Sequence, residues 1–454
     1  MNAPSYQDYL ALDSRPVPDV LRAAPAVHAT LGTEPLAAAR YTSREFFDLE
    51  CERLWPRVWQ MACREEELPA AGSFVVYDIV DRSFIVMRGA DSRLRAFHNS
   101  CPHRGRQLLA GQGHVERVRC GFHGFSWTPE GALQSLPCRW DFAHVPAQKW
   151  ALSEVRVDTW GGFVFLNMDR DAPPLADYLG VLPAHFARWR LEDCWKSAHV
   201  AKVIDCNWKV AQEAFMESSH VIATHPQILG VIADANSQYD LYGEHVNRNI
   251  AAFGAPSPHL GDDGVPAPQI VEQMLAMWRK DGGGKARDAH DAQNARAALG
   301  AINRRAFARA FEGDFESATD AELLDAIVYN VFPNFSPWGG FAPNIVYRWR
   351  PNGRDVDSCI MEVMLLKRLP RGGGRPAPVP VRWLSANEPW ATADELPILG
   401  AVIDQDMPNM PWVQRGLRAS GSGEVQLGAY QESRIRHFHR TLDRYLRAGE
   451  PGPA

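Results

Sequence analysis

The 454-residue chain has no apolar run long enough to cross a bilayer, which excludes a membrane-spanning protein. It has no excess of basic residues either, since the formal net charge is −6, so that a broad attraction to nucleic acid is not expected. The start of the sequence lacks the basic and apolar stretches of a secretory signal. With 46% apolar and 22% charged residues, the composition is typical of a soluble globular protein without a membrane or nucleic-acid partner.

Two further absences concern redox chemistry. Most of the eight cysteines are scattered without the spacing of a disulfide framework, which predicts a protein of the reducing cytoplasm. The sequence also lacks a G-x-G-x-x-G motif after a predicted strand, so no nicotinamide- or flavin-binding domain is evident. A redox enzyme with this sequence would therefore receive its electrons from another protein.

Cysteine and histidine are instead concentrated in two short segments. Residues 101–105 read Cys-Pro-His-Arg-Gly and residues 120–124 read Cys-Gly-Phe-His-Gly, which gives C-x-H, a gap of 16 residues and then C-x-x-H. Two thiolates and two imidazoles in this order can hold a Rieske [2Fe–2S] cluster, in which two cysteines bind one iron and two histidines bind the other. The predicted cluster ligands are Cys101, His103, Cys120 and His123.

A structural zinc site is the alternative, because zinc also accepts two cysteines and two histidines. Zinc sites usually separate the first two ligands by two to four residues, whereas only one residue separates Cys101 from His103. Each segment also contributes one cysteine and one histidine, which suits a two-iron cluster better than a single ion. Arg106 and Phe122 stand where respiratory-complex Rieske proteins carry a crosslinking cysteine pair, so the segments resemble the low-potential Rieske proteins of bacterial oxygenases.

The chain is much longer than one Rieske domain requires, and two or more domains are expected. Short strand patterns separated by turns predict a small all-β domain over residues 50–168, preceded by an N-terminal arm and helix over 1–49. Residues 169–454 mix helical and strand patterns, which gives the whole chain an α+β class. The last part contains predicted helices over 205–224 and 432–447, the second with a solvated basic face, and predicted strands over 345–350 and 359–366.

The helix predicted around residue 215 carries a second set of potential metal ligands. Glu213, Glu217 and His220 are spaced i, i+4 and i+7, which places them on one helical face. His225 precedes a proline, which disfavours helical geometry, so its imidazole can turn back toward His220. Two histidines and one carboxylate form the triad that holds non-haem Fe(II) and leaves positions open for O₂ and substrate.

The carboxylate of this triad is expected from residues 403–410, where Asp406 is favoured over Asp404. Alone, H-x4-H is a weak signal, and two ordinary histidines would explain it. The cluster motif favours the metal site over two ordinary histidines, because an electron carrier needs an electron acceptor in the same chain. The predicted iron ligands are therefore His220, His225 and Asp406.

Over roughly residues 40–450 the chain resembles the α subunits of Rieske non-haem iron oxygenases, the aromatic-ring-hydroxylating family. The resemblance implies a small all-β Rieske domain and a catalytic domain of the helix-grip type, in which an antiparallel sheet surrounds a long helix. It implies a [2Fe–2S] Rieske cluster, mononuclear Fe(II), a partner reductase with or without a ferredoxin, and a head-to-tail homotrimer with or without a β subunit. The residues that carry it are 101–105, 120–124, Asn207-Trp208-Lys209, Glu217, His220, His225, Phe332-Pro333-Asn334-Phe335, Asp406 and 414–417.

The activity implied by this resemblance is that of a terminal oxygenase, which uses O₂ and electrons from the reductase to hydroxylate an aromatic or alicyclic substrate. Glu217 would bridge a cluster histidine of one subunit to an iron histidine of the next. The family usually has Asp at this position; Glu is also found there, more among the monooxygenase-like members. Two alternatives stay open: a monooxygenase that performs oxidative demethylation or C–N cleavage, and an electron-transfer or redox-sensing protein without oxygenase activity. An apolar pocket for a small-molecule substrate is predicted from Phe215, Val221, Phe332, Phe335 and Trp338.

Overall fold

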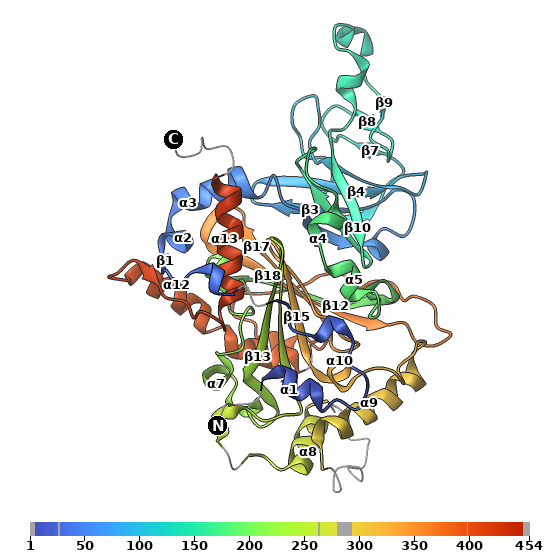
Figure 1. Cartoon of the computed structure of the whole chain (residues 1–454). Coiled ribbons are helices and arrows are strands. Elements are labelled where there is room, and N and C mark those ends of the chain that lie inside the picture. Colours follow the sequence, from blue (N-terminus) through green and yellow to red (C-terminus); the bar gives the residue numbers. More distant parts are fainter. Residues whose placement is uncertain (1–4, 26–27, 262–263, 279–292, 397, 448–454) are drawn as a thin grey trace. The chain divides into compact units, whose positions relative to one another are not determined.

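The computed structural model describes residues 5–25, 28–261, 264–278, 293–396 and 398–447, and it divides into two compact units (Figure 1). The small unit comprises residues 48–178 and 351–354. The large unit comprises residues 1–47, 179–350 and 355–454. The segment predicted as a separate arm and helix is thus grouped with the large unit up to Phe47. Among the described residues, no helix has both the length and the apolar character needed to span a bilayer.

The small unit is an all-β fold. A seven-stranded sheet has the order β2-β11-β10-β5-β4-β3-β6, and a three-stranded sheet has the order β7-β8-β9. Cys101 and Cys120 belong to the same buried hydrophobic cluster as Phe97 and Trp127, so the loops that carry the cysteines are anchored in the core. The strands are β2 (Gln60–Arg64), β3 (Ser73–Ile79), β4 (Arg82–Arg88), β5 (Leu94–His98), β6 (Gln112–His114), β7 (Val118–Arg119), β8 (Ser126–Trp127), β9 (Leu133–Ser135), β10 (Glu154–Trp160) and β11 (Phe163–Asn167).

The large unit is built on an eight-stranded sheet of order β13-β14-β15-β16-β17-β18-β12-β19, in which β12 pairs antiparallel with β18 and parallel with β19. The C-terminal helix α13 (Ser433–Arg447) contacts β13 and β14 (Figure 1). Helices joined to a largely antiparallel sheet confirm the predicted α+β class. The strands are β12 (Cys194–Ile204), β13 (Ile232–Tyr242), β14 (Val246–Phe253), β15 (Ala326–Val331), β16 (Phe335–Pro337), β17 (Asn344–Asn352), β18 (Asp355–Arg368) and β19 (Arg382–Leu384).

The prediction of one continuous helix over 205–224 is wrong. The structure has two short helices, α6 (Trp208–Glu213) and α7 (Val221–Thr224), separated by a turn. In this turn the Glu217 carboxylate accepts hydrogen bonds from the backbone N–H groups of Ser219 and His220. A side chain that satisfies these amides replaces the helical hydrogen bonds, so the helix ends and restarts.

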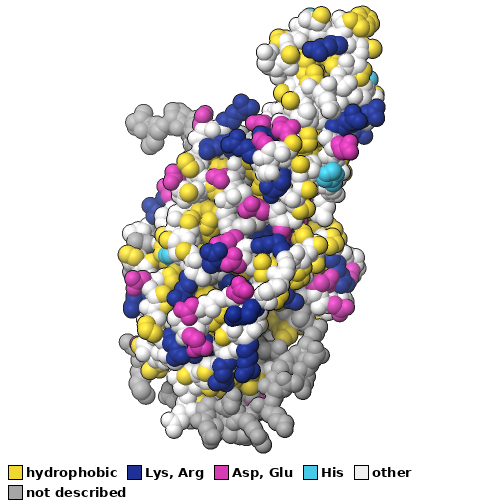
Figure 2. Space-filling view, turned by 90° about the vertical axis from the view of Figure 1, so that its right-hand side faces the viewer, with side chains coloured by type: hydrophobic (Ala, Val, Ile, Leu, Met, Phe, Trp, Pro, Cys, Tyr) yellow, Lys and Arg dark blue, Asp and Glu magenta, His cyan; other side chains and the backbone are white. Residues whose placement is uncertain are grey.

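Helix α13 also differs from its prediction. A basic face of this helix was expected to be solvated, and Arg440, Arg444 and Arg447 are indeed exposed, but Arg434 and Arg436 are only 0% and 5% exposed. The first part of the helix is therefore buried beyond its apolar face, whereas the i, i+4 and i+7 positions Arg440, Arg444 and Arg447 form an exposed basic face. On the face drawn in Figure 2, basic and acidic side chains are interspersed, in keeping with the low net charge of −6.

A buried ion network in the large-unit sheet provides a stability test. Glu362 on β18 is 2% exposed and accepts hydrogen bonds from Arg348 at 2.6 and 2.7 Å and from Arg350 at 2.9 Å. Replacing Glu362 by glutamine removes the negative charge that buried Arg348 and mostly buried Arg350 share. We expect Glu362→Gln to lower the free energy of unfolding by about 3–5 kcal/mol, measured by urea denaturation at pH 7.

The same network has a defined pH dependence. Burial alone would raise the pKa of Glu362, but the charges of Arg348 and Arg350 hold it well below its usual value. A folded-state pKa below the unfolded one gives stability that is present above the unfolded value, about 4.3, and is lost as the pH falls below it. The difference in the free energy of unfolding between wild type and Glu362→Gln should therefore shrink below about pH 4. A difference that stays constant with pH would contradict this account.

Candidate metal centres

The two cysteine-containing loops of the small unit have the same backbone geometry. In each, the cysteine N–H donates to the carbonyl of the residue after the glycine, at 2.9 Å for Cys101 and 2.8 Å for Cys120. The N–H of the glycine donates back to the cysteine carbonyl, at 2.9 Å from Gly105 and 3.1 Å from Gly124. These glycines have φ values of +72° and +78°, a conformation that other residues rarely adopt, which explains why both segments end in glycine.

The loops bring the two predicted histidine ligands together and the two predicted cysteine ligands together. The rings of His103 and His123 have centroids 4.7 Å apart, and His103 stacks on Phe125 at 4.9 Å. The Nδ1 atom of His103 is buried and has no hydrogen-bond partner in the described structure, which leaves it available as a ligand atom. Burial alone would raise the pKa of the Cys120 thiol, but hydrogen bonds from the N–H groups of Phe122 and His123 lower it overall. Two thiols and two imidazoles in this arrangement fit a Rieske cluster.

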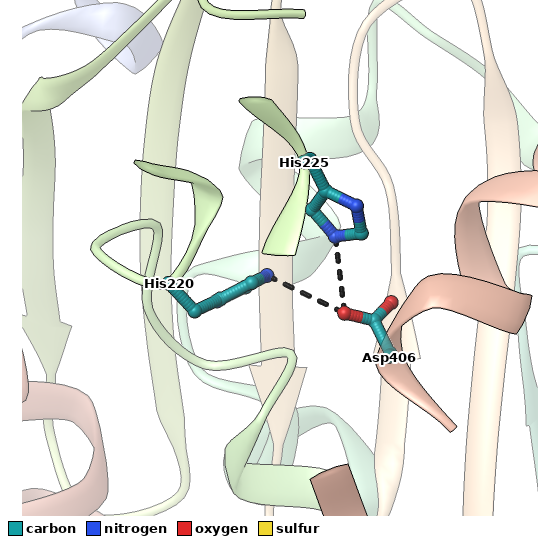
Figure 3. Close-up of side chains that lie close together, drawn as sticks. All are labelled: His220, His225 and Asp406. Carbon is teal, nitrogen blue, oxygen red and sulfur yellow. Dashed lines mark ion pairs between the residues drawn. The ribbon is translucent and has the colours of Figure 1, made fainter. Parts of the chain in front are cut away.

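The large unit brings His220, His225 and Asp406 together from distant parts of the sequence (Figure 3). His220 and His225 flank the short helix α7, and Asp406 is the last residue of α11 (Leu399–Asp406). The Asp406 Oδ1 atom lies 3.0 Å from Nε2 of His225 and 3.8 Å from Nε2 of His220. One donor atom from each of the three residues lies within 4.8 Å of the others, which is the donor set of a two-histidine, one-carboxylate iron site.

Hydrogen bonds on the far side of each imidazole fix its orientation. Nδ1 of His220 lies 2.8 Å from Oε1 of Glu217, and Nδ1 of His225 lies 2.9 Å from Oε1 of Gln405. Because carboxylate and amide oxygens accept, each Nδ1 carries the proton and each Nε2 is free to bind a metal. Burial alone would lower the pKa of His220, but the Glu217 carboxylate raises it overall.

The two candidate aspartates have different surroundings. The carboxylate of Asp404 accepts hydrogen bonds from the backbone N–H groups of Trp390 at 2.7 Å and Ala391 at 2.9 Å. It therefore holds a neighbouring turn of the backbone, whereas the carboxylate of Asp406 faces the histidines. This geometry supports the choice of Asp406 over Asp404 as the proposed ligand.

Glu213, the third residue of the predicted helical face, makes other contacts. It accepts a hydrogen bond from the Tyr41 hydroxyl at 2.9 Å and lies 2.8 Å from Nε2 of His439. A cavity of about 410 Å³ opens next to the metal-binding group, and both Glu213 and Glu217 line it together with His220. Of the two glutamates, Glu217 is the one that hydrogen-bonds an imidazole of the group within the described residues.

Aromatic side chains of strand β17 pack against the predicted pocket residues Phe215 and Trp338. The ring of Phe215 lies 4.9 Å from that of Tyr347 and 5.4 Å from that of Trp349, and Trp338 lies 6.3 Å from Tyr347. Burial first, and then the negative charge of Asp406, raise the pKa of Tyr347. None of these aromatic side chains lines the cavity of about 410 Å³ beside His220. Tyr347 and Trp349 were not predicted, although their i, i+2 spacing in a predicted strand places them on the same face as each other.

The remaining predicted pocket residues have varied positions. Val221 and Phe335 are buried, in agreement with either a pocket or a core role. Phe332 stacks on Tyr445 at 5.5 Å and lies 5.3 Å from Phe438, both on α13. The ring of Phe332 therefore belongs to the packing between the sheet and α13. None of the five predicted pocket residues lines the cavity beside His220, so a substrate role for Phe215, Val221, Phe335 and Trp338 stays a proposal.

The fold and the two donor sets define a Rieske-type non-haem iron protein. The family model described as "Rieske [2Fe-2S] domain" matches residues 58–146, and the model described as "Ring hydroxylating alpha subunit (catalytic domain)" matches residues 184–448. The chain therefore belongs to the ring-hydroxylating α-subunit family.

Two relatives illustrate the range of this family. The carnitine monooxygenase oxygenase subunit of Escherichia coli K12 is 32% identical over 194 residues, which cover 42% of this chain and 52% of the relative. The α subunit of biphenyl 2,3-dioxygenase from Rhodococcus jostii RHA1 is 31% identical over 209 residues, which cover 44% of this chain and 45% of the relative. The chain thus aligns with about half the length of these relatives.

Solved structures of the family share the fold over nearly the whole chain. The quaternary ammonium Rieske monooxygenase CntA in complex with L-carnitine has a TM-score of 0.64 at 17% identity and covers 94% of this chain and 99% of its own. Naphthalene 1,2-dioxygenase from Rhodococcus sp. bound to indole has a TM-score of 0.61 at 21% identity and covers 92% of this chain and 95% of its own. At these identities the likeness establishes the fold alone.

Proposed function

We propose that the chain is a terminal oxygenase component, which takes electrons from a partner reductase and uses O₂ to hydroxylate an aromatic or alicyclic substrate. The observation that carries this proposal is that one polypeptide holds two donor sets, one suited to a Rieske cluster and one suited to mononuclear iron. An electron carrier and an oxygen-binding site in one chain are the two parts that such a reaction requires. The proposal also includes a reducing, cytoplasmic setting and a homotrimer, with or without a β subunit. Electrons would reach it from the reductase with or without an intermediate ferredoxin.

When bound, a [2Fe–2S] cluster would supply single electrons and Fe(II) would supply positions for O₂ and substrate. His220, His225 and Asp406 would hold the iron on one side, which leaves its other side open. Glu217 would keep the His220 imidazole in the tautomer whose Nε2 faces the iron. The aromatic cluster of Phe215, with Tyr347, would exclude water and bind an apolar substrate.

Oxidative demethylation or C–N cleavage is the second candidate function. Similarity to the carnitine monooxygenase subunit, at 32%, is as high as similarity to the biphenyl dioxygenase subunit, at 31%. Glu217 is also the residue more typical of the monooxygenase-like members of the family. An aromatic wall can hold a quaternary ammonium group by cation–π attraction as well as an aromatic ring by stacking.

The direct test is O₂ uptake by the purified protein with NADH and a surrogate reductase, across a panel of aromatic acids, aromatic hydrocarbons and quaternary amines. Ring hydroxylation supports the first candidate, and release of an aldehyde or a demethylated amine supports the second. A protein that accepts electrons but consumes no O₂ with any compound of the panel, although iron is bound, would instead support an electron-transfer or redox-sensing role.

The cluster itself is tested by spectroscopy. Reduced wild-type protein should give a Rieske-type electron-spin resonance signal, and His123→Ala should abolish that signal because one iron loses a ligand. His114→Ala is a suitable control, since this histidine also lies in the small unit but bonds the Ala71 carbonyl at 2.9 Å. A colourless wild-type protein with stoichiometric zinc would refute the cluster assignment.

A further inference from the structure

Arg434, near the start of α13, is fully buried at 0% exposure. Its Nε donates to Oδ1 of Asn247 at 2.7 Å, and its Nη1 donates to the Met216 carbonyl at 3.2 Å and to Oδ1 of Asn249 at 3.4 Å. Among the described residues no carboxylate is hydrogen-bonded to it, and its Nη2 has no partner. A buried guanidinium group without a carboxylate is costly to retain, so its contacts require an explanation.

Those contacts converge on the turn that carries Glu217. Met216, whose carbonyl the arginine binds, directly precedes Glu217 in the chain. On the other side of Glu217, the Ser218 hydroxyl accepts a hydrogen bond from Nδ2 of Asn249 at 3.0 Å, and the Ser218 N–H donates to the Tyr239 hydroxyl at 3.1 Å. The arginine thus holds one neighbour of Glu217 directly and the other through Asn249.

The position of this turn decides whether Glu217 reaches the metal-binding group. Glu217 uses Oε1 for Nδ1 of His220 at 2.8 Å, while Oε2 accepts from the His220 N–H at 3.1 Å and from the N–H and hydroxyl of Ser219. The turn lies between two short helices, so helical hydrogen bonds do not fix it. Its geometry depends on side chains that reach it from β13, β14 and α13.

We propose that Arg434 is a positioning residue, which clamps the backbone on both sides of Glu217 and thereby keeps the Glu217 carboxylate on Nδ1 of His220. The inference rests on the proposed function for its catalytic consequence, because only in an oxygenase does the orientation of His220 affect turnover. Its structural consequence, a rigid turn over residues 216–220, does not depend on that function.

Helix α13 offers a matched control. Arg436, two residues further on, is 5% exposed and likewise donates to backbone carbonyls, those of Leu427 at 2.5 Å and Glu34 at 2.9 Å. These carbonyls belong to segments outside the Glu217 turn. Arg436→Gln therefore removes a buried arginine from the same helix without touching the proposed clamp.

The first measurement is amide hydrogen exchange on the purified full chain. We expect Arg434→Gln to accelerate exchange of the Ser219 and His220 amides by about tenfold or more, while Arg436→Gln leaves them near wild type. Arg434→Lys keeps the charge but cannot reach Met216 and Asn249 together, so it should give an intermediate acceleration, and it decides the question if Arg434→Gln does not fold. Unchanged exchange in a folded Arg434 variant, or equal acceleration in Arg436→Gln, would overturn the proposal.

The second measurement separates positioning from general stability. With reductase and a substrate found in the panel above, Arg434→Gln or Arg434→Lys should lower kcat by about tenfold or more at unchanged KM and iron content. A looser turn with wild-type kcat would overturn the positioning role. If the wild type itself shows no turnover, the proposed function fails, while the exchange experiment still decides whether Arg434 holds the turn.

Discussion

Replacing Asp406 by alanine is expected to remove the mononuclear iron and to lower turnover by roughly a thousandfold or more, while the Rieske-type signal stays at wild-type strength. The reason is geometric, because the Asp406 carboxylate is the one that lies 3.0 Å from Nε2 of His225. Iron content by elemental analysis, spin resonance of the reduced protein and O₂ uptake would be measured on the same preparation.

Asp404→Ala is the matched control for this prediction. Asp404 lies on the same helix but binds the backbone N–H groups of Trp390 and Ala391, so its loss should cost about 1 kcal/mol of stability and leave both metals in place. If Asp404→Ala lost the iron and Asp406→Ala kept it, the choice between the two aspartates would be reversed, although the type of site would stand.

The second large effect is expected for Glu217→Gln. This change keeps the size of the side chain and an acceptor oxygen for Nδ1 of His220, but it removes the negative charge from a contact of 2.8 Å. We expect both metals to remain, turnover to fall by about a hundredfold, and the cluster to stay reduced when the protein is mixed with substrate and O₂. Stopped-flow absorbance of the cluster would follow its reoxidation.

Glu213→Gln provides the comparison, because Glu213 lines the same cavity but bonds Tyr41 and His439 instead of the metal-binding group. Near-normal reoxidation in Glu217→Gln together with slow reoxidation in Glu213→Gln would transfer the role to Glu213. Near-normal reoxidation in both variants would mean that neither carboxylate links the two metal centres.

The two donor sets were within reach of sequence reasoning because they consist of residue types that few other roles require at such spacing. Cys101 and Cys120 each open a five-residue segment that ends in glycine, and the structure shows that both glycines need positive φ. Asp406 was the harder ligand to choose, since α11 is about 180 residues away from His225 and no local pattern connects the two segments.

What sequence reasoning missed depends on long-range contacts. The i, i+4, i+7 spacing of Glu213, Glu217 and His220 predicted one helix, yet Glu217 folds back onto the amides of Ser219 and His220 and ends it. The burial of Arg434 and Arg436 on α13 was missed, because Arg434 binds Asn247, about 190 residues away, and Arg436 binds the carbonyl of Glu34, about 400 residues away. Hydrogen bonds of this kind leave no periodic signal in the sequence.

The small unit is discontinuous, since residues 351–354 belong to it although they follow the rest of it by more than 170 residues. Arg354 at this position pairs with Asp81 at 2.8 Å and with Asp48 at 3.3 Å. During synthesis Asp81 therefore leaves the ribosome 273 residues before its partner. The small unit is completed only after most of the large unit has been translated, and a gene fragment that ends at Tyr178 encodes it without this last piece.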